Sequence, residues 1–187
     1  NLTADEFDIT ASNIKLFQDR EKILAEGNVL IIGQDGITIE AESATYDKKK
    51  NVINAEKSVK ITDTKTNDEL KSDKIQYSKN KQEILAEGNV FFKSSSGVTI
   101  KTEIALYDKK NQIIKSDQST TMDDGYGNSI LLDMFNYSTK NKSLRSKGYI
   151  KMTDKYENKY FFDDIFIDIK KKRMAGSNLK LKFKKDM

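Results

Sequence analysis

A heptapeptide that occurs twice sets the period of this chain, and that period constrains the fold more than any other feature. ILAEGNV stands at residues 23–29 and again at 84–90, 61 positions later. The match continues through GITIEAESATYDKKK from Gly36 and GVTIKTEIALYDKKN from Gly97. A weaker half-repeat lies within each copy, as in VINAEKSVKI at 52–61. The chain thus divides into six units of about 30 residues, and such periods indicate arrays whose units stack and bury a shared face.

Each unit has the pattern of two β-strands. In ILAEGNVLI at 23–31, apolar residues alternate with polar ones, as in a strand with one buried face. In ITIEA at 37–41 the alternation continues and then slips by one residue before Ala44 and Tyr46, which predicts a β-bulge near 42–43. Short polar turns separate the strands, and no helical period competes. The sequence predicts an all-β fold of about a dozen antiparallel strands in two facing sheets with open edges.

The repeats fill nearly the whole chain. We therefore predict a single domain over 1–187, with a less patterned lead-in at 1–8 followed by the repeats at 9–183. A stacked array leaves an open sheet edge at each end, and an open edge can accept a strand from another chain.

Composition excludes several classes of function. Cysteine and histidine are absent, which removes disulfides, thiolate metal sites and the commonest general base. The 33 Lys and Arg and 29 Asp and Glu residues are mixed along most of the chain, whereas a nucleic-acid partner calls for a concentrated basic stripe. The carboxylates fall mostly at outward positions or in turns. We expect no enzyme, no catalytic residues, no metal, no cofactor and no nucleic-acid partner.

The segment ITASNIKLFQDREKILAEGNVLIIGQDGITIEAESATYDKKKNVINAEKSVKI resembles the OstA-like repeat of the lipopolysaccharide transport proteins. The shared pattern is an alanine-rich strand, Tyr-Asp and a polar turn, then a strand with alanine, any residue and Gly-Asn-Val, and it covers roughly residues 3–181. The resemblance implies a twisted, partly open β-jellyroll whose apolar interior shelters lipid acyl chains. It favours an open groove, whereas the dense packing of protein interiors alone would favour a filled core.

Within that family, the chain is most similar to the N-terminal periplasmic domain of the lipopolysaccharide-assembly outer-membrane protein LptD. This implies a membrane β-barrel after Met187 with its lipoprotein plug, and a location at the periplasmic face of the outer membrane. It also implies that lipopolysaccharide arrives from an LptA-like jellyroll joined by edge-to-edge strand addition. Two alternatives stay open: an LptA-like periplasmic bridge protein, and a structural β-repeat scaffold with a filled core.

The predicted lipid-contact residues are the inward-facing, mostly aliphatic positions along the chain, although plain core packing explains any one of them equally well. They are Ile14, Ile23, Ala25, Val29, Ile31, Ile39, Ala41, Ile53, Val59, Ile61, Ile75, Val90, Phe92, Ile100, Ala105, Ile130, Leu132, Phe135, Ile150 and Phe162.

Two further residue classes recur with the period. Tyr46, Tyr77, Tyr107 and Tyr137 form a column, and we expect their rings to close the rim above the turns with the hydroxyls toward water. Contact with the polar shoulder of the lipid is the alternative. Lysines cluster at 48–50, 109–110, 170–173 and 180–185, where we expect a solvated face or, alternatively, attraction for lipid phosphates.

Overall fold

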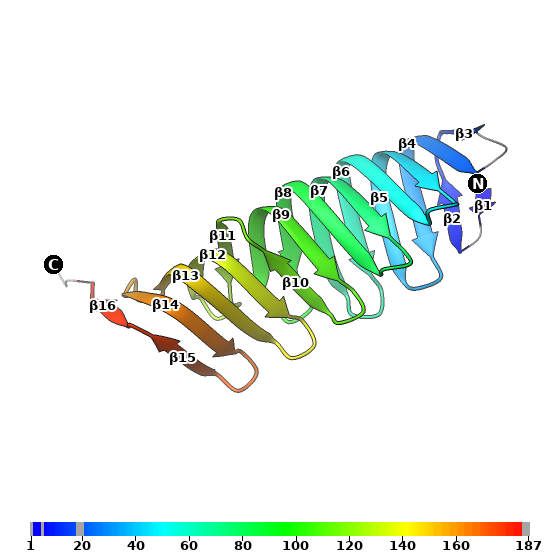
Figure 1. The fold of residues 1–187 in the computed structure, drawn as a ribbon. Helices are drawn as coiled ribbons and strands as arrows, with labels where there is room; N and C mark the ends of the chain where they lie inside the picture. The colour runs from blue at the N-terminus through cyan, green and yellow to red at the C-terminus, as the bar shows by residue number, and fades with distance from the viewer. Residues whose placement is uncertain (1, 5, 18–20, 185–187) are drawn as a thin grey trace.

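The computed structural model describes residues 2–4, 6–17 and 21–184, and within them it contains sixteen strands in one antiparallel sheet (Figure 1). Residues 1 and 5 of the predicted lead-in and residue 185 of the last lysine cluster lie outside the described residues. The strands are β1 (Leu2–Ala4), β2 (Phe7–Thr10), β3 (Asn13–Phe17), β4 (Lys22–Gly33), β5 (Ile37–Asp47), β6 (Val52–Asp63), β7 (Asp68–Ser78), β8 (Glu83–Lys93), β9 (Thr99–Asp108), β10 (Ile113–Ser116), β11 (Thr120–Asp123), β12 (Ser129–Ser138), β13 (Ser143–Thr153), β14 (Lys159–Asp168), β15 (Arg173–Ser177) and β16 (Lys180–Lys182).

The strands follow one another as a meander, so the predicted antiparallel all-β fold is confirmed. At three positions in the strand order, two short strands lie end to end, whereas every other position holds one strand. β2 and β3 both pair with β4, β10 and β11 lie between β9 and β12, and β15 and β16 both pair with β14. These breaks explain why the strands outnumber the predicted dozen.

A line of β-bulges crosses the sheet and divides it into two layers. The ladders shift register between Glu26 and Val29, between Glu40 and Ser43, and at the same level in the following long strands. The bulge predicted near 42–43 is therefore confirmed. Because a bulge bends and twists its strand, the two predicted layers are the two halves of one continuous sheet. Figure 1 shows the resulting long body, with the chain termini at opposite ends.

The repeated Gly-Asn pair forms the bulge. Gly27 and Asn28 have φ values of 77° and 49°, and Gly88 and Asn89 have 78° and 50°. Glycine adopts this left-handed backbone without steric cost, and asparagine does so more readily than most residues. The heptapeptide ILAEGNV therefore recurs because two strands, β4 and β8, bend in the same way.

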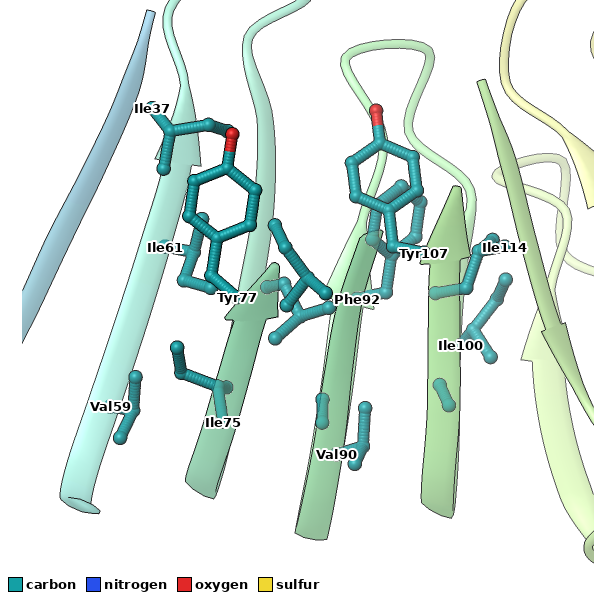
Figure 2. Packing of buried hydrophobic residues seen from close by; sticks show 14 of the residues in the cluster. Ile37, Val59, Ile61, Ile75, Tyr77, Val90, Phe92, Ile100, Tyr107 and Ile114 are labelled. Carbon is teal, nitrogen blue, oxygen red and sulfur yellow. The ribbon is translucent and has the colours of Figure 1, made fainter. Parts of the chain in front are cut away.

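The core is one continuous cluster of buried apolar side chains between the two layers, reaching from Phe7 in β2 to Ile169 after β14. Figure 2 shows its middle part, where Val59, Ile75 and Val90 project from neighbouring strands toward the same interior. Among the described residues, no helix has the length and apolar character needed to cross a membrane.

Candidate functional site: the apolar interior and its seam

The structure brings the predicted lining residues together. All of them except Ile14 are buried, with at most 8% of the side chain exposed, and they belong to the single core cluster. Ile14 in β3 is partly exposed and packs against that cluster. The alternation of apolar and polar residues placed each of them on the correct face, because successive strand residues point to opposite sides of a sheet.

Cross-strand pairing arranges the interior in rows that run along the molecule. A row of alanines lies beside the bend, interrupted once by isoleucine, and rows of larger side chains lie on either side of it. The alanine row contains Ala25, Ala44, Ala55, Ile75, Ala86 and Ala105. The row on one side contains Ile31, Ile39, Ile61, Leu70, Phe92, Ile100, Met122, Ile130 and Met152.

The tyrosine column completes the interior on the other side of the alanine row. The side chains of Tyr46, Tyr77, Tyr107 and Tyr137 are at most 3% exposed. The rings belong to the core cluster, and the hydroxyls do not face water as expected. The Tyr107 and Tyr137 hydroxyls are buried, and the Tyr46 hydroxyl donates a hydrogen bond to Asn51 Oδ1 at 3.0 Å.

The two layers meet along a seam, defined here by Asp35, Asp63, Tyr77, Lys79 and Lys109. The Tyr77 hydroxyl donates a hydrogen bond to the Asp35 carboxylate. The Lys109 ammonium donates to the Asp35 carbonyl oxygen at 2.9 Å and lies 3.8 Å from Asp63 Oδ2. Lys79 Nζ lies 3.5 Å from Asp35 Oδ2. Turns from opposite ends of the strands are thus joined by charged hydrogen bonds, which closes the interior on this side.

The seam shifts the titration of its groups. Burial alone raises the pKa of Asp35, but the Tyr77 hydrogen bond and the ammonium groups of Lys109 and Lys79 outweigh it, so the pKa is lowered. Burial raises the pKa of Tyr77, and the hydrogen bond to Asp35 raises it further. Burial is also the main cause of the raised pKa values of Tyr107 and Tyr137. The tyrosines therefore stay neutral and Asp35 stays ionised at neutral pH.

Sequence reasoning missed most of the seam. It grouped Lys109 with the solvated lysine clusters, whereas the Lys109 side chain is only 10% exposed. It did not single out Asp35, Asp63 or Lys79. The hydrogen-bonded partners lie 42 and 74 residues apart in the chain, so no local pattern could have paired them.

A cavity of about 640 Å³ lies on the outer face of the sheet, across β8–β10 and β12–β14. Leu85, Leu106 and Phe166 point into it, because they alternate with buried interior residues. Arg145 lies beside them, with its guanidinium carbon 4.6 Å from the centre of the Phe166 ring. The sequence did not reveal this hollow, because its residues read as an ordinary solvent face.

Comparison with known proteins addresses the fold. No family model matches the sequence, and no curated protein matches it. Among solved structures, the chain matches LptH, described as the LptA-homologous periplasmic component of the conserved lipopolysaccharide transport device from Pseudomonas aeruginosa. The TM-score is 0.55 at 18% identity, over 60% of this chain and 82% of LptH.

The chain shares the fold of LptH. At 18% identity, the similarity is one of backbone arrangement.

Proposed function

We propose that this chain is a periplasmic lipopolysaccharide-transport jellyroll that shelters acyl chains along its apolar interior. The rows of alanine, isoleucine and other apolar side chains, which repeat at every step along the molecule, carry this proposal. Each methylene removed from water is worth about 0.8 kcal/mol. A lining that repeats without fixed polar anchors holds an acyl chain equally well at successive positions, as a conduit requires.

Entry of lipid requires the two layers to separate, because buried side chains fill the interior between them. The seam is the place where this separation needs no backbone ladder to break, since side-chain contacts such as Tyr77–Asp35 and Lys109–Asp35 hold it. The side chains beside the bend are small, so a modest displacement of one layer creates room for an acyl chain.

Two positions within a transport device are compatible with the proposal. The motifs Tyr-Asp and Ala-Glu-Gly-Asn-Val each occur twice. Their occurrence favours the N-terminal periplasmic domain of an LptD-type outer-membrane protein, which passes lipid to the barrel and its plug. The likeness to LptH supports an LptA-type periplasmic bridge. In either position, an open edge of the sheet, beside β1 or β15, is where a neighbouring jellyroll would add a strand.

Site-specific photo-crosslinking in cells that carry the full-length protein tests the proposal. Probes at Val29 and Val90, which are 2% and 1% exposed, report on the interior. Probes at Glu26 and Glu87, near the bend and outside the core cluster, are the matched controls. We expect lipopolysaccharide adducts at the valines and none at the glutamates.

A further probe at Met134, which lines the outer cavity, separates interior binding from binding in that cavity. Adducts at Met134 alone would move the lipid to the outer face and contradict the proposal. Absence of adducts at every position, with transport active and the protein folded, would leave the scaffold function.

The structural scaffold remains the second candidate because of one observation: the interior is filled by its own side chains. Ile39, Ile53 and Ile100 have no exposed surface. A scaffold of this kind would keep its layers closed at all times, whereas a conduit must open along the seam.

A further inference from the structure

The net positive charge of the chain is concentrated at its C-terminal end. Over the whole sequence, 33 Lys and Arg face 29 Asp and Glu, which gives a net charge of +4. Residues 154–187 hold ten cationic and six acidic residues, whereas residues 1–153 hold 23 of each. Figure 1 places β14 to β16 at one extremity of the long body. One end of the molecule is therefore cationic, and the rest of it is neutral.

Exposed aromatic side chains lie at the same end. Tyr126 stands in the turn between β11 and β12, Tyr156 in the turn between β13 and β14, and Phe183 directly after β16. Their side chains are 59%, 66% and 71% exposed. Packing in the core of this chain does not explain aromatic side chains that are this exposed.

These residues and their lysines form one surface, which we call the terminal patch: Tyr126, Lys155, Tyr156, Lys159, Lys172, Lys182, Phe183 and Lys184. The two turns are adjacent, because a Cβ added at Gly127 would lie 3.2 Å from Cβ of Lys155. Lys172 Nζ lies 5.4 Å from the centre of the Tyr126 ring, and Lys155 Nζ lies 4.9 Å from that of Tyr156.

A hollow of about 500 Å³ in the patch is bordered by three lysines, Lys159, Lys182 and Lys184, together with Phe183 and Glu157. Glu157 forms an ion pair with Lys184. The nearby Asp154 accepts hydrogen bonds from the side chains of Asn158 and Tyr160 within its own turn. The acidic groups are thus engaged locally. Lys159 and Lys182 line the hollow, and within the described part of the chain neither ammonium group lies within 4.0 Å of a carboxylate.

We propose that the terminal patch docks onto an anionic lipid bilayer. Tyrosine and phenylalanine beside lysine are the side chains that settle at a membrane interface, with rings at the headgroup level and ammonium groups among the phosphates. Lysine side chains are attracted by the negative surface potential of an anionic bilayer. A protein partner is less favoured, because lysine is depleted in the cores of protein interfaces.

Docking in this way would direct the long axis of the molecule away from the bilayer, with the opposite sheet edge at β1 available to another chain. The inference is independent of the cargo proposed above, because it concerns a different surface and needs no lipopolysaccharide.

Co-sedimentation of the purified chain with vesicles tests the proposal. The vesicles contain phosphatidylcholine alone, or phosphatidylcholine with phosphatidylglycerol, and no lipopolysaccharide. We expect binding to the phosphatidylglycerol vesicles that weakens as salt is added, and little binding to phosphatidylcholine alone. Lys155→Glu with Lys182→Glu should weaken binding at least about tenfold, from the loss of several charge contacts. Tyr156→Ser with Phe183→Ser should also weaken it.

The matched controls carry the same changes at the opposite end of the molecule: Lys49→Glu with Lys50→Glu, and Phe17→Ser, which is 49% exposed in the native chain. These variants should bind as the native chain does. Circular dichroism confirms folding of each variant, since all the substituted residues are exposed or partly so. Failure of the native chain to bind anionic vesicles, equal binding to both vesicle types, or equal losses in patch and control variants would each overturn the proposal. An acidic protein partner would then be the better explanation of the patch.

Discussion

At the scale of single residues, backbone conformation explains the repeated phrase from which the chain is built. The bulges of β4 and β8 require left-handed φ values at consecutive positions, and Gly-Asn supplies them. At Gly88 the bulge also lies against Asp73, whose carboxylate accepts a hydrogen bond from Asn89 Nδ2 at 2.8 Å. The backbone conformation of the bulge is therefore enough to explain the Gly-Asn pair of the repeated heptapeptide.

Gly88→Ala should destabilise the protein by about 2–4 kcal/mol, combining backbone strain with overpacking. A Cβ at this position would lie 2.9 Å from Cβ of Asp73. The matched control is Gly97→Ala, where φ is 91° but no atom lies within 4 Å, so only the strain of about 1 kcal/mol remains. Urea denaturation of both variants measures the difference, and equal losses would show that the contact with Asp73 is unimportant.

The buried tyrosines predict a dependence of stability on pH. The pKa values of Tyr77, Tyr107 and Tyr137 are raised above the ordinary value of 10.0, chiefly by burial. The folded state therefore keeps protons that the unfolded state releases, so this stabilisation is complete below pH 10 and is lost as the pH rises above it. Thermal denaturation between neutral and alkaline pH should show a falling Tm, and Tyr107→Phe should fall less steeply. Tyr156→Phe, at an exposed position, should follow the native curve.

At the scale of structural elements, the seam decides whether the two halves of the sheet stay together. Its contacts join the β4–β5 turn to the turns that follow β7 and β9. Lys109 is the central residue, because it lies between the Asp35 and Asp63 carboxylates. Any opening of the interior must break these contacts first.

Lys109→Met should destabilise the protein by about 3 kcal/mol, because it removes the ammonium group that pairs with the buried Asp63 carboxylate and leaves Asp35 with Lys79 alone. The control is Lys60→Met, which removes an exposed ion pair to Glu40 at 3.4 Å and should cost less than about 1 kcal/mol. Denaturant titration provides both values. If the two variants lose the same stability, the seam does not hold the layers together.

At the scale of the whole molecule, the sheet is an array in which backbone hydrogen bonds join each strand to its neighbours. Stability in such arrays is approximately local, and the ends open more readily than the middle. β15 and β16 consist mostly of exposed residues, whereas β6 to β8 alternate buried and exposed positions along their full length.

Hydrogen exchange should therefore be fastest in β15 and β16 and slowest in β6 to β8. Mass spectrometry of exchanged peptides measures this gradient along the chain. Uniform protection would indicate that the sheet opens only as a whole, and it would contradict the local description.

The sequence predicted the buried faces of the long strands well and those of the first short strands less well. Strand faces were predicted because alternation is a property of consecutive residues, and it placed Val29 and Val90 in the interior correctly. Ile14 is less buried than expected, because β3 occupies only half of a place in the sheet and lies at its edge. The lead-in was underestimated: Phe7 and Ile9 are buried in β2, but two residues are too few to show a period.

The sequence by itself determined the strand period, the inward faces and the position of the bend, because each depends on residues within one or two turns of one another. Only the tertiary structure decided how the layers close, since the angle at each bulge sets which distant turns meet. That closure buries the tyrosine hydroxyls and places Lys109 beside Asp35, 74 residues away. It also brings the lysines and aromatic residues of four separate segments into the terminal patch.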